Sequence, residues 1–224
     1  MSALIALAGC GSSHTSPRVQ LGSHPRLESI FEDETLLHQD PSAALAQFQS
    51  LGVDRVRVYV PWNSIAPSAS ARTAPQFRAA DPASYPAAGW SVYDQIVRAA
   101  RLRGIGLDFT LGGPAPVWAE GPGEPKGGFI GVWKPKATDF RAFVQAVGTR
   151  YSGTYKPSGA ASPLPRVAFW SIWNEPNYGQ DLAPQAIHHS TVEVSTRLYR
   201  DLLDAAWAAL GATGHGHDTI LFGE

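Results

Sequence analysis

Hydrophobic and polar positions follow two different periods along the chain. Short apolar runs rich in β-branched residues, typical of strands, occur at 27–31, 53–60, 105–111, 167–172 and 219–222. Between these runs, apolar residues recur every three or four positions, which is typical of amphipathic helices. The sequence therefore predicts five strands that alternate with helices.

The predicted helices have recognisable ends. Asp40 is followed by proline, a pattern that favours a helix start, and Ser91 is expected to cap the next helix, which Gly104 ends. A third helix is predicted over 138–151. Residues 190–193 match a capping box and are expected to open the last helix before the fifth strand.

This alternation predicts an α/β fold with a parallel sheet, and two architectures fit it. One is an open doubly wound sheet, and the other is a (β/α)8 TIM barrel. The composition of the second strand favours the barrel, because its two faces differ: one has Val56, Val58 and Val60, and the other has Arg55, Arg57 and Tyr59. No glycine-rich phosphate-binding turn follows the first strand, as a dinucleotide-binding fold requires.

The number of βα units bears on the extent of the domain. Five units occupy roughly 200 residues, so eight would need well over 300. We therefore expect residues 21–224 to be the N-terminal part of an incomplete barrel, with about five of its eight strands. The long Pro- and Gly-rich connections 61–90 and 112–136 both follow strands, which places them at the face where barrels bind ligands.

Residues 1–20 are expected to lie outside the folded domain. Residues 7–10, Leu-Ala-Gly-Cys, resemble a bacterial lipobox, in which Cys10 would carry a lipid and residues 11–17 would form a tether. The apolar run is short and no basic residue precedes it, so an ordinary cleaved signal and a chance match stay open. We expect export, with lipid anchoring at the cell envelope or else secretion.

Composition and net charge limit the classes of binding partner that we expect. Hydrophobic residues make up 44% of the chain and charged residues 17%, which is typical of a folded globular protein rather than a disordered one. The net charge of −1 gives no reason to expect binding to nucleic acid. The single cysteine excludes an internal disulfide, and the histidines at 188–189 and 215–217 lack a carboxylate at ligand spacing, so neither a metal nor a cofactor is expected.

The sharpest chemical feature is Trp-Asn-Glu-Pro at 173–176, directly after the fourth strand. Proline after Glu175 forces a sharp turn that would present the carboxyl group. Trp173 could supply an apolar wall, and partial desolvation would keep the carboxyl protonated as a general acid. The alternative is that Glu175 caps a turn or pairs locally.

Trp-Asn-Glu-Pro at the end of a fourth barrel strand resembles clan A of the glycoside hydrolases, which are retaining (β/α)8 enzymes. Residues 56–62, 113–119 and 220–224 resemble the second, third and fifth strand ends of the same clan. The resemblance covers residues 27–224 and is closest to family 39 and to cellulase-like members of family 5.

The resemblance implies roles for several residues. Glu175 would be the general acid/base, and Asn174 would hydrogen-bond the sugar 2-hydroxyl. Arg57 would orient the nucleophile carboxylate, and its alternative is a structural ion pair inside the barrel. The nucleophile of the clan is a Glu after strand seven, which this sequence does not reach. Glu224 after the fifth strand is interpreted as a subsite or structural carboxylate. The alternative is a substitute nucleophile, which adjacent strands allow geometrically but which departs from the pattern of the clan.

Four aromatic residues follow strand ends, and their rings could stack on the apolar faces of sugars: Trp62, Trp118, Trp133 and Tyr178. Packing into the loop core is the alternative for each of them. The acidic run 32–34 follows the first strand and is interpreted as a solvated charge run.

Together these features predict a retaining glycoside hydrolase that acts on O-glycosidic bonds of oligo- or polysaccharides, so a carbohydrate is the expected partner. A non-catalytic carbohydrate-binding lipoprotein on the same scaffold is the main alternative. A barrel enzyme of unrelated chemistry is the third, because a fold does not fix a function.

Overall fold

The sheet has five strands that all run in the same direction. The computed structural model describes residues 27–187 and 190–223. In chain order the strands are β1 (Ile30–Phe31), β2 (Arg55–Pro61), β3 (Gly106–Gly112), β4 (Phe169–Ile172) and β5 (Thr219–Phe222). Each strand pairs in parallel with the next one in sequence. A doubly wound sheet reverses its strand order at a switch point, so this sequential order confirms the α/β prediction and favours barrel topology.

Several residues singled out from the sequence lie outside the described part of the chain. They are Cys10, His188, His189 and Glu224. Within residues 27–187 and 190–223, no helix has both the length and the apolar character needed to cross a membrane.

Helices link the strands and cover the sheet. They are α1 (Glu34–Gln39), α2 (Pro41–Ser50), α3 (Trp62–Ile65), α4 (Ala87–Arg103), α5 (Ala137–Arg150) and α6 (Ser195–Ala212), with short 3-10 turns η1 (Pro82–Ser84) and η2 (Val117–Ala119). The Asp40 side chain accepts from the Ala43 backbone N–H and so caps α2, as predicted. Gly104 ends α4 in a left-handed conformation (φ 68°), which glycine adopts without steric cost.

Two predicted helix starts are wrong. The helix α4 begins at Ala87, four residues before Ser91, and Pro86 precedes it without a side-chain cap. The helix α6 begins at Ser195 rather than within 190–193. The Ser190 hydroxyl instead accepts from the Val192 backbone N–H at 3.0 Å, which closes a local turn. The Ser190 hydroxyl therefore accepts a backbone hydrogen bond as a helix cap would, but it stabilises a turn before α6 instead.

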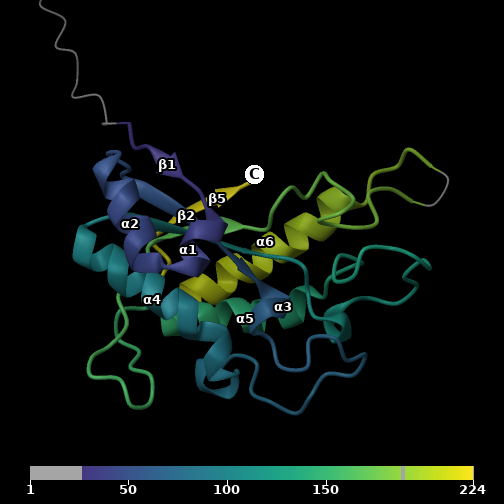
Figure 1. Cartoon of the computed structure of the whole chain (residues 1–224). Helices are drawn as coiled ribbons and strands as arrows, with labels where there is room; N and C mark the ends of the chain where they lie inside the picture. Colours follow the sequence, from purple (N-terminus) through teal and green to yellow (C-terminus); the bar gives the residue numbers. More distant parts are fainter. Residues whose placement is uncertain (1–26, 188–189, 224) are drawn as a thin grey trace, which may run out of the picture.

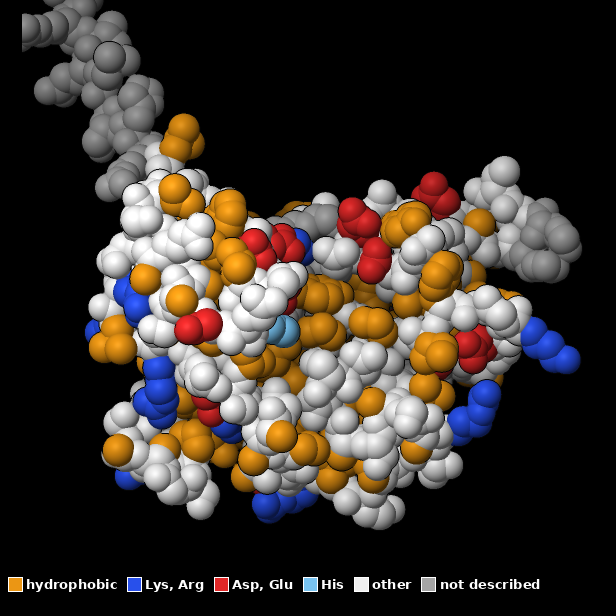
Figure 2. Space-filling model, viewed as in Figure 1, with side chains coloured by type: hydrophobic (Ala, Val, Ile, Leu, Met, Phe, Trp, Pro, Cys, Tyr) orange, Lys and Arg blue, Asp and Glu red, His pale blue; other side chains and the backbone are white. Residues whose placement is uncertain are grey.

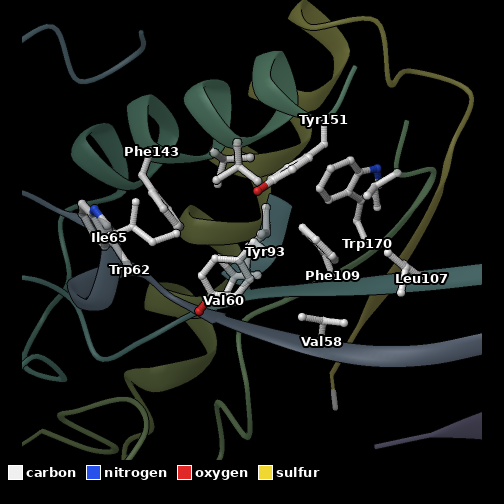
Figure 3. Packing of buried hydrophobic residues seen from close by; sticks show 14 of the residues in the cluster. Val58, Val60, Trp62, Ile65, Tyr93, Leu107, Phe109, Phe143, Tyr151 and Trp170 are labelled. Atoms are coloured by element: carbon white, nitrogen blue, oxygen red, sulfur yellow. The ribbon is translucent and has the colours of Figure 1, made fainter. Parts of the chain in front are cut away.

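The two faces of the sheet differ as the strand composition predicted. Val56, Val58 and Val60 are completely buried beneath the helices. Figure 3 shows Val58 and Val60 among rings from the helices and neighbouring strands, Phe143 and Phe109 among them. Polar groups lie on the other face, where the Ser171 hydroxyl donates to the carboxylate of buried Asp108 at 2.9 Å. A polar inner face is what a barrel interior near a binding site requires.

The loops after β2, β3 and β4 all leave the carboxyl ends of the strands. Figure 1 shows the loops after β3 and β4 projecting to the right of the view, whereas the chain after β2 and α3 runs along the lower side of the molecule. The loops 113–136 and 173–194 are joined by backbone hydrogen bonds, from Lys134 N–H to the Ala183 carbonyl (2.7 Å) and from Ala183 N–H to the Val132 carbonyl (2.9 Å). The predicted ligand-binding face therefore carries two loops that brace each other.

Candidate active site

Arg57 on β2 is the centre of a hydrogen-bonded cluster at the carboxyl edge of the sheet. Its Nε donates to Thr110 Oγ1 on β3 at 2.8 Å. Its Nη1 donates to Glu32 Oε2 at 2.8 Å, and its Nη2 donates to Asn174 Oδ1 at 2.9 Å. Three directional bonds fix the plane of the guanidinium. Arg57 thus joins the ends of β1, β3 and β4 at one place.

The acidic run after β1 is only partly the solvated run that we expected, because Glu32 is exposed while Asp33 and Glu34 are half-buried. Glu32 forms an ion pair with Arg57. A structural ion pair is the role that we gave as the alternative to orientation of the nucleophile by Arg57. Glu34 Oε1 accepts from the Tyr59 backbone N–H at 2.6 Å, and burial raises the pKa of Glu34. Asp33 caps α1 through the Leu36 N–H. The Asp33 side chain thus caps a helix, whereas contacts with β2 hold Glu32 and Glu34.

The turn after β4 holds two residues in a left-handed backbone conformation. Trp173 N–H donates to the Leu111 carbonyl at 2.8 Å and so continues the pairing of β3 with β4. Trp173 then has φ 67° and Glu175 has φ 38°, and neither is glycine. A left-handed residue before proline is more unusual still, and each such conformation costs about 1–3 kcal/mol. Strain of this kind often marks a functional turn.

Trp173 does not form the apolar wall that we expected beside Glu175. Its indole is 1% exposed, packs edge-on against Phe140 at 5.4 Å between ring centroids, and donates to the Asp181 carbonyl at 3.0 Å. Glu175 itself is exposed. Trp173 therefore anchors the turn from beneath, while the carboxyl group of Glu175 is open to solvent and to a ligand.

Two successive turns bring Asp181 back to the site. The Glu175 carbonyl accepts from the Tyr178 N–H at 2.8 Å, and the Tyr178 carbonyl accepts from the Asp181 N–H at 3.0 Å. Leu182, next in the chain, is completely buried and fixes this segment to the core. Asp181 was not predicted as a site residue, and no periodic or motif signal in residues 177–187 marks it.

Burial and neighbouring charges shift the pKa of Asp181. Burial raises the pKa of Asp181, the negative charge of Glu175 raises it further, and a hydrogen bond from Asn174 lowers it in part. Burial also raises the pKa of Tyr59 on β2, and the charge of Asp181 adds to that rise. Asp181 therefore lies within electrostatic reach of both Glu175 and β2.

The four predicted stacking residues fall into two groups. Trp62 is completely buried, stacked on Phe143 and edge-on to Trp118, and Trp118 is only 5% exposed. Neither ring offers a face to a sugar, so the packing alternative holds for both. Trp133 is partly buried, and Tyr178 is exposed. Among the four, these two alone retain accessible ring surface.

Metal ligation has no support in the described residues. Among them, no three His, Cys, Asp or Glu side chains are grouped so that they could hold a metal ion. His215 is completely buried, with Nδ1 at 2.6 Å from Asp218 Oδ2 and Nε2 at 3.0 Å from the Gly148 carbonyl. Both ring nitrogens are thus engaged by protein acceptors.

Figure 2 shows how charge is distributed over the face seen in Figure 1. Acidic side chains gather in the upper middle of this face, whereas most Lys and Arg side chains lie along its left, lower and right margins. Figure 1 places the end of β5 and the loop leading to α6 in the same upper region. This charge distribution agrees with a carboxylate-rich strand edge.

Comparison with known proteins yields similarity in structure only. No family model matches the chain, and no curated protein matches it in sequence. The β-glucosidase from Trichoderma harzianum superposes with a TM-score of 0.54 at 17% identity, over 83% of this chain and 36% of that one. A β-glucosidase from Thermotoga maritima in complex with glucoimidazole gives 0.52 at 17% identity, over 82% and 36%. The AHE enzyme from Alicyclobacillus herbarius gives 0.50 at 16%, over 82% and 36%.

These similarities establish the fold. The two β-glucosidases are TIM-barrel glycoside hydrolases, and the chain spans a little over a third of their length. The five described strands are therefore arranged as five consecutive strands of a (β/α)8 barrel, as predicted. At this identity the comparison does not extend to activity.

Proposed function

We propose that the protein is a retaining glycoside hydrolase of clan A, with Glu175 as its general acid/base. The observation that carries the proposal is the hydrogen bond of 2.9 Å between Arg57 Nη2 and Asn174 Oδ1. This bond fixes the residue next to Glu175 onto β2 at the carboxyl edge of a barrel sheet. Barrel enzymes have their active sites at this edge.

In this proposal Glu175 performs two proton transfers. It first gives its proton to the glycosidic oxygen as the bond to the leaving group breaks. In the second half-reaction it removes a proton from the water that attacks the glycosyl-enzyme. The exposed carboxyl group on a strained turn is open to both the leaving group and the incoming water.

Asn174 is proposed to bind the sugar 2-hydroxyl. Its Oδ1 is occupied by Arg57, so the amide presents N–H groups as donors. A hydrogen bond to the 2-hydroxyl that strengthens in the transition state supplies part of the rate acceleration. Tyr178 and Trp133 are the proposed stacking surfaces for further sugar units, because their rings remain accessible.

A retaining reaction also needs a nucleophile carboxylate about 5–5.5 Å from that of Glu175. In clan A this group follows strand seven, beyond the five strands described. The substrate class that we propose is oligo- or polysaccharides with O-glycosidic bonds. The β-glucosidase neighbours make an aryl β-glucoside a suitable first substrate to assay.

Export with a lipid anchor on Cys10 is also a proposal, supported by the Leu-Ala-Gly-Cys sequence at 7–10. Labelling of the full-length protein with a radioactive fatty acid tests it. Label that is incorporated into the wild type and lost in Cys10→Ser supports anchoring. Equal labelling of the two proteins contradicts it.

Leaving-group dependence in Glu175→Ala tests the catalytic proposal in the full-length protein. Glycosides with poor leaving groups need the proton, so their cleavage should slow by about 10²–10⁴-fold. Activated aryl glycosides need it little, and their first step should survive and show a burst as the intermediate accumulates. The matched control is Asp201→Ala, an exposed carboxylate on α6, which should leave both rates unchanged. Near-normal cleavage of natural glycosides by Glu175→Ala would show the assignment to be wrong.

A further inference from the structure

We infer that Glu32 is a positioning residue of this site: through its ion pair with Arg57 it fixes the side-chain amide of Asn174, the residue before the proposed acid/base. The inference rests on the proposed function and deepens it, because it adds a residue that the Trp-Asn-Glu-Pro motif does not contain. Glu32 directly follows β1 and Asn174 follows β4, so the fold of the sheet brings the two ends of this contact chain together.

Two consecutive contacts connect Glu32 to Asn174. Glu32 Oε2 accepts from Arg57 Nη1 at 2.8 Å, and Arg57 Nη2 donates to Asn174 Oδ1 at 2.9 Å. A guanidinium only donates hydrogen bonds, so it holds the oxygen of the Asn174 amide rather than the NH2 group. The NH2 group therefore faces away from Arg57, and it is the donor that the proposed contact with a sugar 2-hydroxyl needs.

Glu32 contributes the strongest of the three contacts that hold the guanidinium of Arg57. Thr110, completely buried on β3, accepts from Nε at 2.8 Å, and Asn174 accepts from Nη2. Both of these acceptors are neutral, whereas Glu32 accepts as a carboxylate. A charge-assisted hydrogen bond is about twice as strong as a neutral one. Loss of the Glu32 carboxylate should therefore loosen the plane of the guanidinium and, with it, the amide of Asn174.

A second ion pair on β2, between Arg55 and Glu28, has the same geometry but different surroundings. The N–O distance is 2.8 Å in both pairs, and the side chains of both arginines are 17% exposed. Arg55 also donates to a backbone carbonyl of β3 at 3.3 Å, and its guanidinium lies over the ring of Phe169 at 4.0 Å. The contacts of Arg55 thus belong to the sheet, whereas those of Arg57 lead on to the motif after β4.

The kinetic test compares 4-nitrophenyl β-glucoside with 4-nitrophenyl 2-deoxy-β-glucoside in the full-length protein. Glu32→Ala releases Arg57 and so the amide of Asn174, and kcat/KM on the first substrate should fall about tenfold, the value of one hydrogen bond. The 2-deoxy substrate lacks the hydroxyl that Asn174 binds and should change less than about twofold. Glu32→Gln keeps an acceptor oxygen for Arg57 and should retain most of the discrimination between the two substrates.

Further variants separate positioning from a general loss of charge. The matched control is Glu28→Ala, which removes an equally short ion pair from the same strand and should leave both rates unchanged. In Asn174→Ala the group to be positioned is already absent, so adding Glu32→Ala should cost no further 2-hydroxyl discrimination. Equal losses on both substrates in Glu32→Ala, the same loss of discrimination in Glu28→Ala, or additive losses in the double variant would overturn the inference.

Crystal structures of Glu32→Ala and Glu28→Ala provide a readout that does not depend on activity. We expect the bond of 2.9 Å between Arg57 Nη2 and Asn174 Oδ1 to be lost in Glu32→Ala and kept in Glu28→Ala. The same outcome in both variants would overturn the inference, even if Glu175→Ala abolishes activity. Conversely, a bond lost in Glu32→Ala alone, in a protein that is fully active as Glu175→Ala or that cleaves no glycoside, would contradict the proposed function and leave the positioning contact in place.

Discussion

Two charged clusters lie at opposite ends of the strands and differ in how completely their groups are paired. At the amino ends, Asp218 accepts from Arg166 (2.7 Å) and Trp170 (3.1 Å) and lies 2.6 Å from His215. Burial alone would raise the pKa of Asp218, but the hydrogen bonds from His215, Trp170 and Arg166 together lower it. Each of these polar groups faces an opposite charge or a complementary partner.

The cluster at the carboxyl ends is arranged differently. Asp181 is kept near Glu175, a like charge, and its pKa is raised rather than lowered. The turn that carries Glu175 is strained, and its carboxyl group is exposed. The comparison teaches that the first cluster stabilises the fold, whereas the second holds groups where stability alone would not place them. Such unfavourable placement is expected where a protein binds or reacts.

The largest expected effect is on stability at the amino-end cluster. Asp218→Ala removes the buried carboxylate that binds Arg166 and His215, which then keep only backbone carbonyl partners, and the loss of such a partner should cost about 3 kcal/mol. Removal of the exposed carboxylate in Glu175→Ala should change the free energy of unfolding by less than about 0.5 kcal/mol. Urea unfolding followed by circular dichroism measures both, and similar losses in the two variants would remove the distinction between the clusters.

The next effect is the pH dependence of the stability that Asp218 contributes. The folded pKa of Asp218 is lowered, so its ionised form contributes stability above its unfolded pKa of about 3.9, and this contribution is lost as pH falls through the folded pKa. Asp218→Asn should therefore be less stable than the wild type at pH 7, with a gap that narrows below about pH 4. A gap that is constant from pH 7 to pH 3 would contradict the assigned role of the charge.

A smaller effect tests the strain at the turn. Because Glu175 has φ 38°, glycine should suit this position better than alanine, by about 1 kcal/mol in the free energy of unfolding. At Asp201, inside α6, the order should reverse, because glycine costs about 1 kcal/mol relative to alanine within a helix. Thermal melts of the four variants give both differences. The same order at both positions would show that the turn is not strained.

The smallest effect has the opposite sign to that of Asp218. The folded pKa of Asp181 is raised, so stability falls as pH rises from the unfolded pKa through the folded one. Asp181→Asn removes that loss and should raise Tm slightly at pH 7, with no gain below about pH 4. Differential scanning calorimetry at the two pH values measures it. A lower Tm at pH 7 would place Asp181 with the stabilising cluster instead.

Much of the fold could be predicted from the sequence, because local pattern and tertiary packing agree. The valines of β2 alternate with polar residues, and the structure buries the valines under the helices while the polar face turns inward. The starts of α4 and α6 could not be predicted in this way. Ser91 and Ser190 have the side chains of helix caps, but at Ser91 the helix had already begun, and Ser190 closes a turn.

The site was only partly predictable for a related reason. Arg57 and Asn174 were predicted from a motif and a strand pattern, and the structure brings them together. The pairing of Glu32 with Arg57 depends on how β1 lies beside β2, and Asp181 depends on the two turns after Glu175. Neither leaves a periodic trace in the sequence, since long-range contacts between loops have no local signature.

Azide rescue of Glu175→Ala in the full-length protein tests the central claim most directly. Azide fits the space left by the carboxyl group and needs no general base, so it should restore turnover of activated aryl glycosides. If Glu175 is the acid/base, the product is a glycosyl azide with retained anomeric configuration, identified by NMR. A glycosyl azide of inverted configuration would show that Glu175 is the nucleophile, and the absence of rescue with undiminished activity on natural glycosides would show that it has no catalytic role.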